Sequence, residues 1–238
     1  FRENFRKTLA SANSQHVFKG RWDWVPVAIT LLEKNKHLEG RTIAEIAEER
    51  GDDPFDVFLD LGLEENLATK FTFYLLNMEE EGVAPLLLND GTLISLSDAG
   101  AHNSLLCDAG YAMYLFGHWC REKSLFELPT AIRKVTSDPA DSYGIKDRGQ
   151  LTTGAWADMI LFDPDIIGIT KMERHFDLPA GGERLLRRAP GLKGTWVNGV
   201  QVFDGEDYLD VEAPGEVLTT FTSGLPTLGM GAARAAAE

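Results

Sequence analysis

Apolar residues recur at helical spacing between residues 42 and 65, where capping residues mark two helix starts. Thr42 and Glu45 form a capping box before the run IAEIAEER, which Gly51 ends. Asp53 and Pro54 then start a second helix, FDVFLDLGLEEN, whose apolar residues face a core. We interpret the acidic residues of this helix as a solvated face.

The flanking segments mix helical and extended patterns. Residues 2–12 have helical character, and residues 22–27 are expected to be extended because Pro26 disfavours helix before it. The run FTFYLL at 71–76 predicts a buried strand, and Asn77 with Glu80 predicts a following helix. A second buried strand is predicted at Thr92–Leu96, after a turn at 89–91. The alternation of helices with strands favours a parallel α/β arrangement.

The pattern changes along the second half of the chain. Helices are predicted at 109–123 and from Leu128 onward, and Pro139 and Gly144 punctuate the end of the latter. From Gly149 the chain reads as a small antiparallel β unit. It contains a turn at Thr153-Gly154, a strand at 159–162 and an Asn198-Gly199 type I′ hairpin turn. Residues 171–189 mix Pro, Gly and charge and are predicted to form a loop or insertion.

Composition narrows the class of protein. The chain has 238 residues, is 44% hydrophobic and carries a net charge of −14, from 37 acidic and 23 basic residues. The acidic balance argues against nucleic acid or an anionic membrane as the main partner. No apolar run approaches the roughly 20 residues of a membrane span. Two cysteines give no disulfide framework, so a reducing cytoplasm is the expected location.

The candidate chemistry centres on Asp98, at the end of the predicted strand. A carboxylate there would lie at the C-terminal edge of a sheet, where α/β proteins place their ligands. The small residues 99–101 would allow close backbone approach. The alternative is a turn aspartate that caps the next helix. His102, four residues later, is a candidate metal ligand or substrate contact.

Other reactive residue types give weaker signals. None of the five histidines forms an H-x-H or H-E-x-x-H pair, and His118 is expected to pack within a helix. Cys107 and Cys120 are thirteen residues apart and form no zinc knuckle. Neither cysteine has an evidently basic setting, so a reactive thiolate is not expected. The sequence also lacks a G-x-S-x-G motif, a P-loop and a G-x-G-x-x-G fingerprint.

A series of short motifs between Leu96 and Gly205 resembles one known family. The matching stretches are SDAG at 97–100, RKVT at 133–136 with Pro139-Ala140, YGIKDRG at 143–149, Gly154, Ala157-Asp158, FDP at 162–164 and VNGV at 197–200. In order and spacing they resemble the C-terminal part of the amidohydrolase superfamily. The resemblance is closest to the D-aminoacylase, or N-acyl-D-amino-acid deacylase, branch.

The resemblance implies an α/β fold. Residues 1–147 would be the C-terminal part of a (β/α)8 TIM-like barrel, 148–212 a small antiparallel β domain and 213–238 a tail. It also implies a metal-dependent hydrolase of linear C–N amide bonds, acting on N-acyl (D-)amino acids with one or two zinc-like ions. Asp98 would contact the metal and act as general base toward the metal-bound water. Ser97 and His102 are the candidate substrate contacts.

The chain also departs from the family pattern. The metal-binding histidines of the family precede the aspartate, so we expect them upstream of Phe1, in an N-terminal barrel half that this chain would require. A homo-oligomer is left open. The best-known deacylases carry His-Pro-Arg after the aspartate, where this chain has CDAG at 107–110, so the usual D-amino-acid specificity is not carried over. The open alternatives are a cyclic-amide hydrolase, such as a dihydroorotase or hydantoinase, and a non-catalytic scaffold segment.

Overall fold

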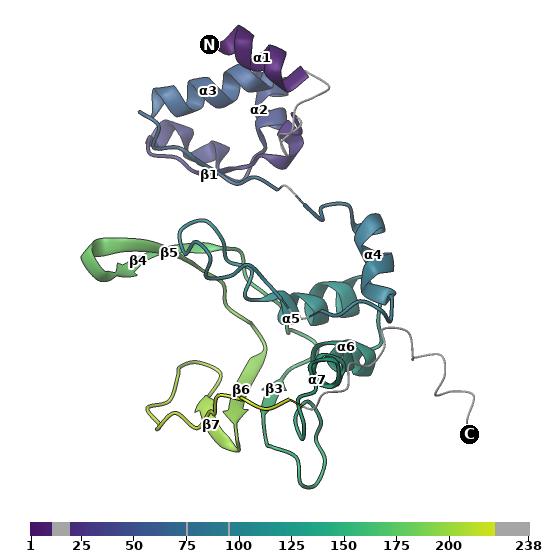
Figure 1. Cartoon of the computed structure of the whole chain (residues 1–238). Coiled ribbons are helices and arrows are strands. Elements are labelled where there is room, and N and C mark those ends of the chain that lie inside the picture. The colour runs from purple at the N-terminus through teal and green to yellow at the C-terminus, as the bar shows by residue number, and fades with distance from the viewer. Residues whose placement is uncertain (11–19, 75, 95, 222–238) are drawn as a thin grey trace. The chain divides into compact units, whose positions relative to one another are not determined.

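Short antiparallel strand pairs, together with helices, make up the chain (Figure 1). The computed structural model describes residues 1–10, 20–74, 76–94 and 96–221. Within these ranges β1 pairs with β2, β4 with β5, and β6 lies between β3 and β7, always antiparallel. The content is thus mixed α and β, but the parallel arrangement expected from the alternating pattern is wrong for the described residues.

The chain divides into two units, Phe1–Val83 and Ala84–Glu238. The described elements of the first unit are α1 (Arg2–Ala10), η1 (Trp22–Trp24), β1 (Val27–Ile29), η2 (Glu33–Leu38), α2 (Ile43–Arg50), α3 (Pro54–Glu64) and β2 (Lys70–Phe71). Helix α4 (Glu80–Leu88) includes the boundary. The predicted segments 1–147, 148–212 and 213–238 stay a prediction.

Local caps shape the first unit as predicted. The Thr42 side chain accepts from the backbone N–H of Glu45, the Glu45 carboxylate accepts from the backbone N–H of Thr42, and Gly51 ends α2 in the left-handed conformation. Asp53 caps α3, with Pro54 as its first residue. The apolar faces of these helices pack with residues that precede them in the core of the unit, which comprises Val25, Val27, Leu38, Ile43, Ile46, Ala47, Val57 and Leu61.

Helix α1 lies against α3 through charge pairs. The Arg2 guanidinium bonds Asp56 at 2.6 Å and also contacts Asp60, while Arg6 bonds Asp53 at 3.0 Å. The rings of Phe5 and Phe55 stack with their centroids 5.0 Å apart. The helix predicted from residue 2 onward is confirmed for Arg2–Ala10. Residues 11 and 12 of the predicted helix lie outside the described ranges.

Three sequence predictions in the first unit are wrong in part. Residues 22–24 of the segment predicted to be extended form a 3-10 turn, whereas Pro26 forms a β-bridge and Val27 begins β1. Of the predicted strand at 71–76 only Phe71 lies in a strand, β2, and residue 75 lies outside the described ranges. Phe73 and Tyr74 are exposed, although the N–H of Tyr74 still bonds Trp24 O at 3.0 Å. Asn77 has φ 57° and so does not cap a helix, which begins at Glu80 instead. An apolar run becomes a buried strand only where a partner covers it.

In the second unit, helices precede strands. Its described helical elements after α4 are α5 (Tyr111–Tyr114), the π-helical segment η3 (Leu115–Glu122), α6 (Leu128–Val135) and α7 (Ser137–Tyr143). The helix predicted from Leu128 onward is divided at Thr136, whose φ of −128° and ψ of −86° are not helical. Gly144 ends α7 in the left-handed conformation, as its position in the sequence predicted.

The strands of the second unit are β3 (Met159–Phe162), β4 (Glu173–Leu178), β5 (Gly182–Leu186), β6 (Leu192–Val197) and β7 (Val200–Phe203), with the short turn η4 (Pro179–Gly181) between β4 and β5. Asn198 and Gly199 both have positive φ, which confirms the I′ turn signal. The ring of Phe116 stacks on Phe162 at 5.4 Å, which joins the helices to this sheet.

The β4–β5 hairpin corrects the loop predicted for residues 171–189. Arg184 makes a bidentate ion pair with Asp177 on the opposite strand, at 2.7 and 2.6 Å. Arg174 pairs with Glu183 at 3.0 Å. Charge-rich composition is typical of loops, but here opposite charges face one another across two strands and stabilise their pairing.

Candidate functional site

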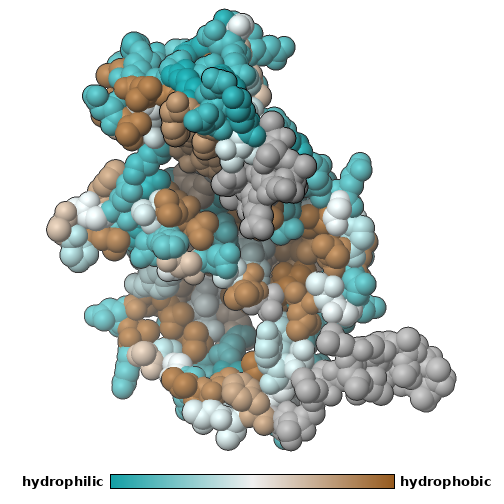
Figure 2. Space-filling model, turned by 45° about the horizontal axis from the view of Figure 1, so that its top comes forward, coloured by the Kyte–Doolittle hydropathy of each residue, from teal (hydrophilic) through white to brown (hydrophobic). Residues whose placement is uncertain are grey.

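The Asp98 loop, residues 89–110, connects α4 to α5 and contains the predicted site residues. Residues 92–94 and 96 form no strand, so the buried strand predicted at 92–96 is wrong for these residues, and residue 95 lies outside the described ranges. Leu96 is 84% exposed. A strand needs a ladder partner, and no described segment pairs with this one. Apolar side chains are exposed in both units, and Figure 2 shows hydrophobic patches among the hydrophilic surface.

Asp98 lies at the start of a turn, with its side chain exposed. Its backbone carbonyl accepts from the N–H of Ala101 at 3.1 Å, and the Ser97 hydroxyl accepts from the N–H of Ala99 at 3.3 Å. Gly100 has φ 90°, a conformation in which a side chain would be strained. The alternative of a helix cap is not supported, because turns and not a helix follow.

His102 starts a second turn directly after the first. Its backbone carbonyl accepts hydrogen bonds from the N–H groups of Leu105 and Leu106, both at 2.9 Å, and His102 is exposed. The structure therefore brings Ser97, Asp98 and His102 onto one exposed loop.

This loop does not form a metal centre by itself. Nowhere in the described part of the chain do three His, Cys, Asp or Glu side chains gather in a group that could hold a metal ion. Zinc in catalytic sites takes three protein ligands or more. The described residues thus do not fit a complete metal site, and Asp98 is at most one of several ligands.

The β4–β5 hairpin holds the Asp98 loop, which the sequence did not suggest. The N–H of Leu185 donates to Asn103 O at 2.8 Å, and Nη1 of Arg174 donates to Ser104 O at 3.1 Å. Figure 1 shows the hairpin (green) beside the blue-teal trace of this loop. The signals that were missed are the polar–apolar alternation of HFDL at 175–178 and the turn residues Pro179–Gly181 that follow it.

Among the remaining histidines and cysteines of the described residues, His118 and Cys120 have structural contacts. His118 stacks on Tyr114 at 4.7 Å and contacts Glu122 at 3.0 Å, as expected for a helix-packing histidine. Burial, together with the charge of Glu127, raises the pKa of the Cys120 thiol, which disfavours the reactive thiolate form of this cysteine. His16 lies outside the described ranges.

Glu65 is a buried carboxylate in the first unit. It is 1% exposed, which corrects the prediction that the acids around α3 form a solvated face. Burial alone would raise the pKa of this carboxyl. Hydrogen bonds from the Leu31 N–H, the Asn35 amide, the Leu32 N–H and the Thr69 hydroxyl outweigh that effect and lower the pKa to about 2. With its oxygens satisfied by fixed donors, Glu65 is a structural group and not a general base.

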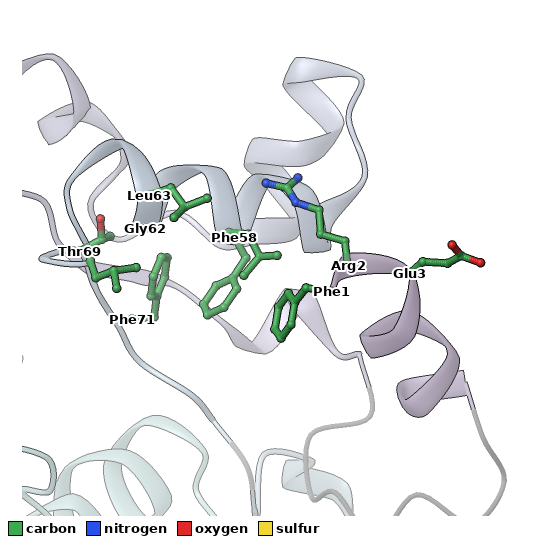
Figure 3. A pocket seen from close by; sticks show the side chains of 10 residues that line it. Phe1, Arg2, Glu3, Phe58, Gly62, Leu63, Thr69 and Phe71 are labelled. Carbon is green, nitrogen blue, oxygen red and sulfur yellow. The ribbon is translucent and has the colours of Figure 1, made fainter.

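An apolar hollow of about 680 Å³ opens in the first unit. Figure 3 shows the rings of Phe1, Phe58 and Phe71 along it, and Leu63 and Thr69 also contribute. It contains none of the predicted site residues and no pair of groups suited to proton transfer.

None of the helices in the described ranges is long and apolar enough to cross a membrane.

Comparison with known proteins gives consistent relatives. A family model described as the amidohydrolase family matches residues 4–203. A D-aminoacylase of Alcaligenes xylosoxydans xylosoxydans is 31% identical over 192 residues, which are 80% of this chain and 36% of that protein. An N-acyl-D-aspartate deacylase of the same organism is 41% identical over 98 residues, 41% of this chain and 18% of its own length. The chain thus spans about a third of the D-aminoacylase.

The solved structures that are similar to this chain are also of D-aminoacylases and an N-acyl-D-amino-acid deacylase. A D-aminoacylase crystal structure, and one concerned with the binuclear metal center in D-aminoacylase, are 25% and 26% identical. An N-acyl-D-glutamate deacylase from Bordetella bronchiseptica, complexed with zinc and a phosphonate inhibitor, is 23% identical. Each match has a TM-score of 0.45 and covers 79% of this chain, and 36%, 36% and 38% of the respective structures.

Proposed function

The chain belongs to the amidohydrolase family, and on this basis we propose that its protein hydrolyses linear C–N amide bonds in N-acylated amino acids. The predicted resemblance to the D-aminoacylase branch is confirmed by relatives of that name. The observation that carries the proposal is the 31% identity to D-aminoacylase along 80% of this chain. A small amide is therefore the substrate class to test first.

Asp98 is the residue to which we assign the proton transfer. Its carboxylate is exposed on a loop of small residues, where water and substrate can reach it. A carboxylate at hydrogen-bonding distance from the attacking water takes up a proton as the C–O bond forms. It then gives this proton to the nitrogen that leaves as the C–N bond breaks. Ser97 and His102 lie on the same loop, and we assign them to substrate contacts because each side chain can donate or accept a hydrogen bond.

A divalent ion is part of the proposal, although the described residues do not hold one by themselves. The titles of the compared structures name a binuclear metal center and zinc for those proteins. For this protein we propose zinc or a similar ion, with Asp98 as one carboxylate ligand. The remaining ligands would come from outside the described residues.

The test is a substrate panel on the protein as its gene encodes it. N-acetyl-D-amino acids, their L-enantiomers and cyclic amides such as a hydantoin are incubated with the protein, and amine or acid release is followed. Release of free amino acid from the N-acyl substrates is expected. Ring opening of the cyclic amide alone would replace the proposal with the cyclic-amide alternative. No turnover of any member, with the metal content verified, would favour a non-catalytic scaffold.

A further inference from the structure

The anchor between the β4–β5 hairpin and the Asp98 loop comes from a single cross-strand pair. Arg174 on β4 lies opposite Leu185 on β5. Leu185 directs its N–H to Asn103 O at 2.8 Å, and the Arg174 side chain bonds the next carbonyl, Ser104 O, at 3.1 Å. In an antiparallel ladder, alternate pairs turn their backbone groups outward, which leaves the Leu185 N–H free for this loop. Two consecutive carbonyls are thus fixed from one position of the hairpin.

The Arg174 side chain is enclosed and oriented. Only 13% of it is exposed, and Nη1, which bonds Ser104 O, also lies 3.0 Å from the Glu183 carboxylate. In the described part of the chain, its Nε is buried without a hydrogen-bond partner. Burying an unpaired donor costs free energy. An ion pair that only stabilised the hairpin would not require this burial. In the same hairpin Arg184 and Asp177 form a bidentate pair in which both side chains are more exposed.

The anchored carbonyls are close to Asp98 along a tightly turned backbone. One turn joins Ala101 N to Asp98 O, and the next joins Leu105 N to His102 O. The segment between Asp98 and Ser104 therefore has little freedom once its far end is held. The turn hydrogen bonds fix the shape of the loop but not its position on the rest of the unit. Because the loop has no ladder partner, its position depends on contacts such as those with the hairpin.

We propose that Arg174 is a positioning residue: it holds the Asp98 loop so that the Asp98 carboxylate meets the substrate at a fixed place. This inference rests on the proposed function of Asp98. Glu183 orients the guanidinium, and Ser104 O receives its hydrogen bond. Arg174 itself touches no reacting atom.

The first test compares Arg174→Ala, Arg174→Lys and Arg184→Ala in the protein as encoded. Because misplacement of a reacting group by ~1 Å is enough to cost about 10²-fold in rate, Arg174→Ala is expected to lower kcat by about 10- to 100-fold. KM should rise as well, because Ser97 and His102, the proposed substrate contacts, lie on the same loop, but the main loss is expected in kcat. The lysine variant should recover much of kcat, because both contacts of Arg174 are made by one nitrogen. Arg184→Ala removes a hairpin ion pair without touching the loop, and it is the matched control.

The second test measures hydrogen exchange and does not depend on turnover. Arg174→Ala should speed exchange at the amides of Ala101, Leu105 and Leu106, while Arg184→Ala should not. If exchange at these amides is unchanged, or if kcat falls equally in both alanine variants, the inference is overturned. If the unmodified protein has no amide hydrolase activity but Arg174→Ala still loosens the loop, the proposed function fails and the anchor stands. Circular dichroism identifies a variant that has unfolded. If Arg174→Ala unfolds, the kcat and the hydrogen exchange of Arg174→Lys, compared with those of Arg184→Ala, test the inference.

Discussion

The carboxylate of Glu65, just beyond the end of α3, accepts a hydrogen bond at 2.8 Å from the backbone N–H of Leu31, 34 residues earlier. The same carboxylate accepts from the N–H of Leu32 at 3.0 Å and from the Thr69 hydroxyl at 2.8 Å. Three separate segments of the first unit thus meet at one buried charge. A group with so many long-range donors stabilises the unit more than a surface acid does.

Replacing Glu65 with glutamine should destabilise the first unit. The amide cannot accept from all the donors that face the carboxylate, and we expect a loss of about 2–3 kcal/mol in the free energy of unfolding. The neighbouring Glu64→Gln is the control, since Glu64 is more exposed and should lose less than about 1 kcal/mol. Denaturant unfolding followed by circular dichroism measures both. Equal losses of unfolding free energy in the two variants would contradict the proposed contribution of Glu65 to stability.

The stability of the first unit should fall in acid through this same group. The pKa of Glu65 is about 2 in the folded chain, against about 4.3 for an unfolded glutamate. A lowered folded pKa gives stability that is complete above the unfolded value and is lost as pH falls toward the folded value. Unfolding measured between about pH 5 and pH 2 should therefore show a decline that is shallower in Glu65→Gln. Superimposable profiles would exclude Glu65 as the cause.

Asp98→Asn should remove amide hydrolysis and leave the fold unchanged. An asparagine cannot take up a proton, so we expect kcat to fall by at least about 10²-fold. Because the side chain is exposed, the thermal midpoint should stay as it was. Asp108→Asn, an exposed aspartate on the same loop, should retain activity. If both variants keep full activity, another group is the base.

Removing metal should stop turnover of the protein as encoded. Treatment with a chelator, followed by dialysis, is expected to abolish release of free amino acid, and added zinc should restore it. Magnesium is the control, because it prefers octahedral oxygen ligands and binds reluctantly at zinc-type sites. Activity that persists after the metal content has been shown to be zero would refute the metal-dependent route.

Gly191→Ala should destabilise the second unit. Gly191 has φ 89°, and an added Cβ would lie 2.7 Å from Ile167 N. The strained backbone and this clash together should cost about 2–5 kcal/mol. Gly154 has φ 93° with open space around its Cα, so Gly154→Ala should show only the backbone cost of about 1–2 kcal/mol. Thermal unfolding separates the two, and similar losses would mean that the region around Ile167 relaxes.

Short-range chemistry made part of the fold predictable. The capping box of Thr42 and Glu45 and the Asn198-Gly199 turn need only neighbouring residues, and both form as the sequence indicated. The segment at 92–96 has the composition of a buried strand, but a strand is a property of two segments. No described partner pairs with it, and composition cannot report that.

Long-range pairing explains what the sequence did not suggest. Three of the donors to Glu65, on Leu31, Leu32 and Asn35, lie 30 to 34 residues earlier in the chain, so the local sequence around Glu65 predicts a solvated side chain. The β4–β5 hairpin is rich in charge because its ion pairs cross between strands, as in Arg184 and Asp177. The candidate site was predictable as a group of neighbours, Ser97, Asp98 and His102. Its anchor was not, because Arg174 and Ser104 are 70 residues apart.

That separation also sets an order in time. The β4–β5 hairpin closes through residues that are near neighbours in sequence, and such contacts form early in folding. Contact between Arg174 and Ser104 requires closing a much longer stretch of chain, at a greater cost in entropy. On the ribosome, which adds residues in sequence order, the Asp98 loop emerges well before the strand that secures it. We therefore expect the loop to gain its final position late, after the hairpin that holds it has formed.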